Sequence, residues 1–389
     1  MSKINNLIKE LCPNGVEYKT LDKICKINKG KQLNKDGLLS DGKYPVINGG
    51  ITPSGYWNEN NYNENLITIS QGGASAGYIA FQLSKFWAGA HCYVVENCEN
   101  NICYKYLYHF LKSKQRELQS SQVGAGIPSV SLKEIYGLKI PIPPLEVQEE
   151  IVRILDKFGE LEAELEAELE ARKSQYEFWR GKLFEKENVK YMKISEFAKC
   201  CAGATPSTSH SEYWENGTIP WMSSGEVNNI EIYDTEKKIT ELGYNSSSTK
   251  MLPINTVVVA LAGQGKTRGL VAITRKEVCT NQSLCGIIPD ERVDNEYLFH
   301  YLQSRYKDLR RISSGDGTRG GLNLKMINDY EVPVPSIDEQ KKIVKVLNKF
   351  SKLVNSYTDG LPAEIELRRK QYEYYRNKLL SFEELSVSE

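Results

Sequence analysis

The sequence lacks the segments that send a protein into or across a membrane. Its first residues, MSKINNLIKELCPNG, contain no apolar run of signal-peptide length, and no later stretch reaches about 18 consecutive apolar residues. Metal-binding patterns are missing too, since the nine cysteines form no C-x-x-C pair and the four histidines lie far apart. We therefore expect a cytoplasmic protein with buried, inert thiols, no disulfide framework and no metal ion.

Several motifs of catalytic sites are also missing. The sequence has no His-Glu-x-x-His, no Asn-Pro-Pro-Tyr, and no dinucleotide-binding glycine fingerprint after an expected strand. Residues 260–267, Ala-Leu-Ala-Gly-Gln-Gly-Lys-Thr, fit a relaxed phosphate-binding loop, which must open a helix at its Lys-Thr. Residues 270–274, Leu-Val-Ala-Ile-Thr, are instead typical of a strand. We expect neither catalysis nor a bound cofactor in this chain.

What the sequence does contain is a long internal repeat. Residues 136–184 and 330–380 match along their length, with Gln148 aligned to Gln340 and Gln175-Tyr176 aligned to Gln371-Tyr372. The offset grows from 192 residues at the start of the block to 196 at its end. A copy this long is a duplicated half-molecule rather than a short solenoid repeat. Two similar halves on one chain suggest two similar sites at a fixed separation.

The repeated blocks are expected to be helices of opposite charge. The chain has a net charge of zero, but residues 146–184 carry 11 acidic and 6 basic residues, whereas residues 338–380 carry 6 acidic and 10 basic residues. Each block follows a proline-bearing extended stretch, and Ser336 or Asp338 can cap the second. Opposite charge favours pairing the two helices with each other. The alternative is two amphipathic helices, each packed on its own domain.

Apolar residues at alternating steps of three and four predict a coiled-coil seam in both helices. The seams are Ile151, Ile154, Phe158, Leu161 and Leu165, and Ile343, Val346, Phe350, Leu353 and Tyr357. Gly360 and Pro362 should bend or break the second helix. Both helices end in aromatic clusters that favour core packing or a docking surface for another subunit. The residues expected at helix contacts or partner contacts are Ile151, Phe158, Leu161, Leu165, Leu169, Tyr176, Trp179, Ile343, Phe350, Tyr357, Tyr372 and Tyr375.

The first helix contains the tetrapeptide Glu-Leu-Glu-Ala three times in tandem, over residues 160–171. Each copy adds about 6 Å to a helix. If the helix separates two binding modules, these copies act as a ruler between them.

The segments before each helix also correspond, although more weakly. Gly30 aligns with Gly203, residues 45–50 with 220–225, residues 65–73 with 257–265, and residues 102–111 with 294–302. Short alternating strands interrupted by glycine loops, with one or two helices, indicate an α+β domain. The fold class is therefore two α+β domains separated by two long helices that form an antiparallel coiled coil, with a pseudo-twofold internal repeat.

The glycine loops carry side chains suited to polar recognition. Residues 70–77 and 263–269 follow expected buried strands and combine glycine with residues that hydrogen-bond bases or phosphates. A solvated surface with flexible turns is the competing interpretation for each residue. The candidate DNA-binding residues are Lys29, Lys31, Gln71, Ser75, Lys114, Gln122, Ser223, Ser224, Gln264, Lys266, Thr267, Arg268, Arg311, Thr318, Arg319 and Asn323.

Two diverged modules, each followed by a block such as Ile-Pro-Ile-Pro-Pro-Leu-Glu-Val-Gln-Glu-Glu-Ile and an Arg-Lys-x-Gln-Tyr-Glu helix, resemble the specificity subunit of a type I restriction–modification system. The resemblance implies one target-recognition domain for each half of a split double-stranded DNA site. It also implies two methyltransferase subunits and restriction subunits as partners, which supply S-adenosylmethionine, ATP and magnesium chemistry. The implied segments are a lead-in at 1–16, recognition domains at 17–145 and 189–337, and helices at 146–188 and 338–389.

Two rival functions stay open at this point, a noncatalytic scaffold that binds proteins and a nucleotide-driven enzyme that uses Lys266. Residues 16–21 resemble residues 189–194, which follow the first helix. We therefore expect residues 4–11 to imitate a helix end and to pack beside the C-terminal helix.

Overall fold

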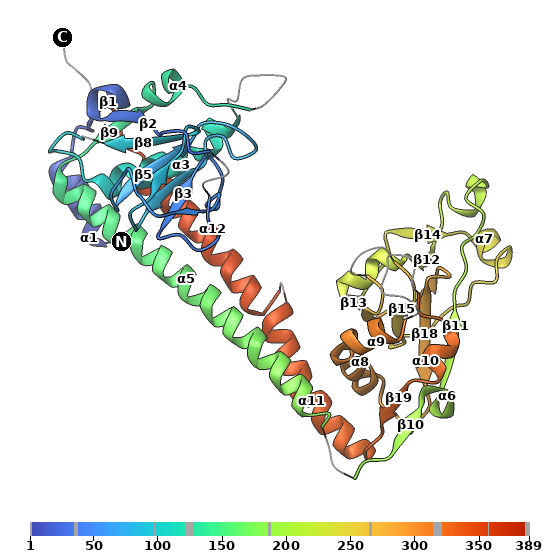
Figure 1. Cartoon of the computed structure of the whole chain (residues 1–389). Coiled ribbons are helices and arrows are strands. Elements are labelled where there is room, and N and C mark those ends of the chain that lie inside the picture. Colours follow the sequence, from blue (N-terminus) through green and yellow to red (C-terminus); the bar gives the residue numbers. More distant parts are fainter. Residues whose placement is uncertain are drawn as a thin grey trace. The chain divides into compact units, whose positions relative to one another are not determined.

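The computed structural model describes residues 2–34, 38–96, 98–120, 128–185, 188–263, 267–313, 321–356 and 358–385. The chain divides into two compact units, which Figure 1 shows with their elements labelled. Unit 1 holds Met1–Glu166 and Glu364–Glu389, and unit 2 holds Ala167–Ala363. Both units mix helices with short strands, as the α+β prediction requires.

Unit 1 contains a four-stranded antiparallel sheet in the order β2-β8-β5-β6. Its central strands, β5 (Leu66–Ser70) and β8 (Cys92–Glu96), are buried on both faces, so each face needs a cover. Helix α3 (Tyr104–Ser120) covers one face, and a second sheet in the order β4-β3-β7 covers the other. The remaining elements are α1 (Ser2–Leu11), β1 (Glu17–Thr20), α2 (Leu21–Ile24), β2 (Lys26–Lys29), β3 (Tyr44–Ile47), β4 (Tyr56–Trp57), β6 (Ile79–Gln82), β7 (Trp87–Ala88), α4 (Leu132–Tyr136) and β9 (Lys139–Ile142).

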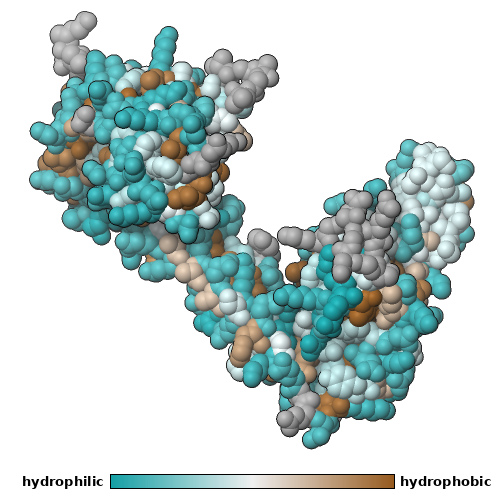
Figure 2. All heavy atoms as spheres, viewed as in Figure 1, coloured by the Kyte–Doolittle hydropathy of each residue, from teal (hydrophilic) through white to brown (hydrophobic). Residues whose placement is uncertain are grey.

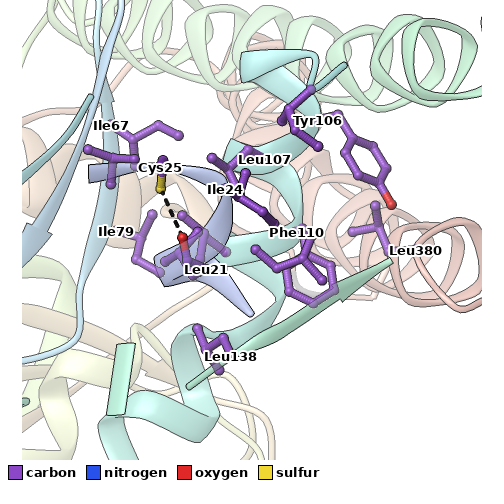
Figure 3. Close-up of a cluster of buried hydrophobic side chains, with 14 of the residues drawn as sticks. Leu21, Ile24, Cys25, Ile67, Ile79, Tyr106, Leu107, Phe110, Leu138 and Leu380 are labelled. Carbon is purple, nitrogen blue, oxygen red and sulfur yellow. Dashed lines mark hydrogen bonds between the residues drawn. The ribbon is translucent and has the colours of Figure 1, made fainter. Parts of the chain in front are cut away.

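The main core of unit 1 lies between its large sheet and α3. Figure 3 shows Leu21 and Ile24 of α2 gathered with Leu107 and Phe110 of α3 and with Leu380, which follows the last helix. All of these side chains are nearly inaccessible to solvent. Burial of a large aliphatic side chain stabilises a fold by about 1.5–3 kcal/mol, so this cluster ties the chain's last helix firmly to the unit.

Unit 2 repeats this plan with one added strand. Its large sheet has the order β11-β18-β15-β16-β13, and its second sheet the order β14-β12-β17. Strand β15 (Val257–Ala260) is buried along its whole length, with alternate residues in the cores on the two faces. The other elements are β10 (Tyr191–Lys193), α6 (Ile194–Phe197), β11 (Ala198–Ala202), η2 (Ser211–Tyr213), β12 (Ile219–Met222), η3 (Ser224–Asn229), β13 (Glu231–Ile232), β14 (Lys237–Ile239), α7 (Glu241–Asn245), β16 (Val271–Thr274), β17 (Cys279–Thr280), β18 (Leu284–Pro289), α8 (Asn295–Ser304), α9 (Tyr306–Ile312), α10 (Leu324–Asn328) and β19 (Glu331–Pro333).

Strand registers align the two units and correct one part of the expected alignment. Ile67 lies opposite Val95 in unit 1, and Val257 lies opposite Ile287 in unit 2. Ile67 therefore corresponds to Val257. The sequence alignment of residues 65–73 with 257–265 is two residues out of step with this register. The apolar runs of the two strands are similar in several registers, and only the hydrogen-bonded neighbours fix one of them.

Three helices follow the globular parts. Helix α5 (Leu145–Lys182) is uninterrupted over 38 residues, while α11 (Ile337–Asn355) and α12 (Leu361–Leu379) are separate. The predicted break at Gly360 and Pro362 is confirmed. Pro362 is tolerated as the second residue of α12, because the first N–H groups of a helix have no intrahelical partner.

The start of α11 was also predicted correctly. Ser336 is its N-cap, and the Ser336 side chain accepts a hydrogen bond from the backbone N–H of Glu339 at 3.4 Å.

Within unit 1, the first half of α5 pairs with α12 in an antiparallel manner. The ring of Phe158 stacks on Tyr375 with 5.6 Å between centroids and lies 6.3 Å from Tyr372. Further along α5, Glu162 binds Arg369 at 2.6 Å, and Glu166 binds the same guanidinium. The expected attraction between the acidic and the basic helix is confirmed in this unit.

Within unit 2, the second half of α5 pairs with α11. Tyr176 stacks on Phe350 with 6.3 Å between ring centroids, and Leu169 packs against the same core. The expected seam of α11 was partly wrong, since Val346 is 40% and Leu353 36% exposed. The predicted set, with Val346 and Leu353, and the observed set, with Leu347 and Val354, both have helical spacing. The observed set is buried because the globular part of unit 2 covers that face of the helix. The apolar residues of α11 that belong to this core or pack against it are Ile343, Val344, Leu347, Phe350 and Val354.

The first helix packs as expected beside the end of the chain. Ile4 of α1 is fully buried in the core that also contains Leu379 and Leu380. The tail continues this contact, because the N–H of Val16 donates to the carbonyl of Glu383 at 2.8 Å.

In the part of the chain that the structure describes, no helix is long and apolar enough to cross a bilayer. Figure 2 shows a mainly hydrophilic surface on the face in view.

Candidate nucleic-acid interface

Several loops of unit 1 meet at one end of its large sheet. The backbone N–H of Gln71 donates to the carbonyl of His91 at 2.9 Å, and the N–H of Val130 donates to the carbonyl of Gln71 at 2.9 Å. The neighbouring sheet joins the cluster through the N–H of Gly89, which donates to Ile47 at 2.8 Å. These bonds fix the backbone of three loops.

Unit 2 makes the same bonds at the corresponding residues. The N–H of Leu261 donates to Ser283 at 2.8 Å, and the N–H of Leu322 donates to Leu261 at 2.8 Å. The N–H of Asn281 donates to Met222 at 3.1 Å. In each unit, one end of the large sheet therefore carries the same set of loops, held together by the same backbone hydrogen bonds. We call this set of loops the loop cluster of that unit.

A glycine without room for a side chain opens the first loop of each cluster. A Cβ on Gly30 would lie 2.4 Å from the carbonyl oxygen of Ala88, and a Cβ on Gly203 would lie 1.9 Å from that of Thr280. These contacts explain the aligned glycines, because no other residue fits there. They also place the residues that follow each glycine at the edge of the loop cluster.

Several predicted residues of unit 1 lie in its loop cluster. Lys29 and Lys31 are exposed on either side of Gly30, and Gln71 and Ser75 lie in the turn after β5. Lys114 lies apart on α3, where its ammonium binds Glu117 at 2.9 Å. The structure therefore brings together four of these residues and leaves the fifth on a helix surface.

The predicted residues of unit 2 are more scattered in their roles. Ser223 and Ser224 begin η3 beside the loop cluster, and Thr267 is half-buried in the loop after β15. Arg268 is only 5% exposed, so its guanidinium is not presented on the surface for a direct contact with DNA. Asn323 caps α10 by accepting a hydrogen bond from Met326 at 2.9 Å.

Arg311 remains highly exposed on α9, where it binds Asp308 at 3.1 Å. Some predicted residues lie outside the described residues. These are the candidate DNA-binding residues Gln122, Gln264, Lys266, Thr318 and Arg319, and the expected helix-contact residue Tyr357.

Two enzyme-like patterns have the wrong structural context. Thr267 of the relaxed phosphate-binding loop is followed by a turn and then by β16, so the helix that such a loop needs does not start there. Residues 73–77, Gly-Ala-Ser-Ala-Gly, fit the pattern of a hydrolase nucleophile turn. They join the antiparallel strands β5 and β6, whereas that turn must lead from a strand into a helix.

One exposed pair in the loop cluster of unit 2 was missed from the sequence. The hydroxyl of Thr205 donates to Oε1 of Gln282 at 2.6 Å. The two residues are 77 positions apart, and neither belongs to a motif. Only the repeat alignment could have drawn attention to them, because Thr205 follows the aligned glycine by two residues.

A buried histidine joins the globular part of each unit to the helices. His109 Nε2 lies 2.9 Å from Asp156 Oδ1, and His109 Nδ1 lies 3.4 Å from the hydroxyl of Tyr372. Burial lowers the pKa of His109, although the hydrogen bond to Asp156 acts in the opposite direction. Nearby, burial and the charge of Arg376 lower the pKa of Lys112 to about 8.

In unit 2, His300 Nε2 lies 2.6 Å from Asn348 Oδ1, and His300 Nδ1 lies 3.4 Å from the hydroxyl of Tyr176. Burial also lowers the pKa of His300. The same aromatic–histidine contact thus recurs, with an amide in place of the carboxylate.

The comparisons with known proteins agree with this internal repeat. A model of the type I restriction modification DNA specificity domain matches the chain twice, over residues 13–171 and 186–367. The chain belongs to the family of type I restriction–modification specificity subunits. The two matches give this specificity subunit two copies of the domain, consistent with a target in two parts.

Relatives of this specificity subunit match it over most of its length. The EcoR124I/EcoR124II specificity subunit of Escherichia coli is 39% identical over 302 residues, which are 74% of each chain. A putative type I specificity subunit of Haemophilus influenzae is 30% identical over 94% of this chain and 96% of its own. The crystal structure of an S subunit from M. genitalium has the same fold, with a TM-score of 0.61 at 19% identity, covering 94% of this chain and 96% of that one.

Proposed function

We propose that each unit of this specificity subunit binds one half of a divided site on double-stranded DNA through its loop cluster. One observation supports this proposal above the others: the two clusters share their backbone bonds and differ in their side chains. Base edges are distinguished by side-chain hydrogen bonds, so a common frame with different polar residues suits two different half-sites.

The proposal includes two methyltransferase subunits held by the helices, and restriction subunits that join them. Phe178 on α5 and Tyr374 on α12 occupy aligned positions and are 56% and 61% exposed. Aromatic residues are enriched in protein interfaces, so these positions support docking of equivalent partners. In this proposal the chain itself is noncatalytic, and its partners bind S-adenosylmethionine, ATP and magnesium.

We assign the complex to the cytoplasm, where a reducing environment suits the nine free cysteines.

A salt series separates DNA reading from protein scaffolding. The full chain with its methyltransferase subunits should bind its own site with an affinity that falls steeply as salt rises, while a preference over unrelated DNA remains. A scaffold that binds only proteins would give no sequence preference at any salt concentration.

The uninterrupted helix α5 supports the ruler prediction. Deletion of residues 164–167, one Glu-Leu-Glu-Ala copy, shortens a helix by about 6 Å. We expect the preferred gap between half-sites to shorten by about one or two base pairs, because a base pair rises about 3.4 Å. Mapping of methylated sites in a host that carries the deletion and the methyltransferase measures this gap.

A control of unchanged length is the double substitution Glu164→Gln and Glu168→Gln, which should leave the gap as it is. An unchanged gap in the deletion variant would contradict the ruler.

A further inference from the structure

Unit 1 contains a cavity of about 170 Å³ beside its loop cluster, lined by residues of β3, β5 and β6. The cavity reaches Ser70, the residue before Gln71, and Gly49, whose carbonyl accepts the hydroxyl of Ser70 at 2.6 Å. A cavity of about 150 Å³ is large enough to bind one benzene ring. The space therefore fits a planar ring of a ligand whose remaining atoms stay outside.

Unit 2 covers the corresponding face of its large sheet. Between β12 and β14 it has fourteen residues, 223–236, which include η3 and β13. Val227 of η3 is 1% exposed and belongs to one core with Val258 and Ala260. Between β3 and β4, unit 1 has only eight residues, 48–55, and none of them forms a helix or a strand. The shorter connection leaves unit 1 without the cover that η3 provides.

The lining of the cavity is polar where the core of unit 2 is apolar. Strand register aligns Thr68 with Val258. It also aligns Ser70 with Ala260, although Thr68 and Ser70 are both buried. Nε2 of Gln82, which also lines the cavity, donates to the hydroxyl of Thr68 at 2.8 Å. Hydroxyl and amide groups can each donate and accept, so this lining suits the polar edge of a ring without selecting one base.

An exposed apolar side chain lies at the same cavity. Ile51 is 66% exposed and belongs to the lining, together with Gly50 and Pro53. Proteins that deform DNA insert such side chains between neighbouring bases and unstack them. A base that leaves the stack is held in a pocket by hydrogen bonds to its polar edge. Ile51 and the cavity therefore supply the two parts that binding of an extrahelical base requires.

We propose that unit 1 takes one unpaired base of its half-site into this cavity while Ile51 enters the stack in its place. This inference rests on the proposed DNA-reading function. It adds the ligand class, a nucleobase outside the duplex, and the residues that bind it. It applies to unit 1 alone, because Val227 packs on the corresponding face of unit 2.

The test measures the affinity of the full chain, bound to its methyltransferase subunits, for paired DNA and for DNA with one mismatch at each position in turn. A mismatched base costs less to unpair, so one mismatch in the unit 1 half-site should tighten binding by about tenfold. Ile51→Ala should weaken binding to paired DNA by about tenfold, and to that mismatched DNA by less than about twofold. Leu83→Ala, a control on a residue that is 78% exposed and lies outside the lining, should change neither affinity.

Two further variants test the cavity itself. Ala80→Leu places a larger side chain in the lining and should abolish the gain from the mismatch. Thr68→Val introduces the residue of unit 2 and should reduce the gain by about threefold, since it removes one hydrogen-bonding group. Methyltransferases also extrude their target base, so only a gain that Ala80→Leu abolishes is assigned to the cavity. Thermal midpoints close to that of the wild type show that both variants fold.

Four results would overturn the inference. A mismatch gain that Ala80→Leu and Thr68→Val leave unchanged would remove the cavity from DNA binding, while the proposed function stands. Equal weakening of paired and mismatched DNA by Ile51→Ala would exclude its insertion into the stack. A thermal midpoint that rises with free nucleosides, without any mismatch gain, would assign the cavity to a free nucleobase instead of a base of DNA. A wild-type complex without sequence preference would overturn the proposed function together with this inference.

Discussion

Unit 1 and unit 2 share their internal bonds more closely than their sequences suggest. Gln148 is fully buried, accepts the N–H of Cys103 at 2.8 Å and donates to the carbonyls of Asn101 and Pro143. In unit 2, Gln340 is fully buried and makes the same three kinds of bond. The buried frame was kept because a lost bond there is costly, whereas exposed loop residues were free to change.

One exchange shows how the frame tolerates change. Trp87 on β7 donates its indole N–H to the carbonyl of Lys31 at 3.1 Å, while Trp221 on β12 donates to the aligned carbonyl of Ala204. The two tryptophans come from different strands, but these strands are parallel neighbours in both units. Either strand can therefore supply the indole that donates a hydrogen bond to the loop after the aligned glycine.

The histidine contacts differ in charge rather than in geometry. His109 meets the carboxylate of Asp156, which also binds Lys105, whereas His300 meets the amide of Asn348. The same joint is therefore partly ionic in unit 1 and neutral in unit 2.

The largest expected effect comes from removing the buried glutamines. Gln340→Ala leaves one N–H and two carbonyls of unit 2 without their partner, at a cost of about 3 kcal/mol. Gln148→Ala should destabilise unit 1 by a similar amount. Hydrogen exchange measured by mass spectrometry assigns each loss to its own unit.

The exposed Gln175 on α5 is the matched control for the two buried glutamines, and Gln175→Ala should change stability by less than about 0.5 kcal/mol. Equal loss of protection in both units from either buried variant would show that the units do not unfold separately.

A medium effect should follow from exchanging the histidine partners. Asp156→Asn removes a charged partner and should cost unit 1 about 1 kcal/mol. It should also lower the pKa of His109 further, while Asn348→Asp should raise the pKa of His300 by supplying a carboxylate. Titration of the two histidines by NMR checks both directions, and shifts of equal sign would contradict the comparison.

The smallest effect concerns pH. The folded pKa of both histidines lies below the ordinary value of about 6.5, so the unfolded chain binds more protons between the two values. Their contribution to stability is complete above pH of about 6.5 and declines as pH falls toward the folded pKa. Urea midpoints between pH 5 and 8 measure this decline, which Asn348→Asp should reduce in unit 2.

A midpoint that rises as pH falls through this window would contradict the burial of neutral histidines.

The helices were largely predictable, since apolar spacing, prolines and the cap Ser336 are local signals. The sequence could not predict whether Val346 or Leu347 is a core residue of α11. Each belongs to a set of apolar residues with helical spacing, and the globular part of unit 2 determines which set is buried. Composition beside glycine singled out Lys29, Lys31 and Gln71, which the structure places at the loop cluster of unit 1, and their contact with DNA stays a prediction. The burial of Arg268 depends on its neighbours in space, which composition does not contain.

The sequence alone determined that this chain has two related halves, where its long helices begin and break, and which family it resembles. These features depend on residues close together or on direct repetition. The tertiary structure decided which faces are buried, how the strands align, and that Thr205 meets Gln282. Such contacts join residues far apart in the chain, and hydrogen-bond register and packing select them from several patterns of similar local energy.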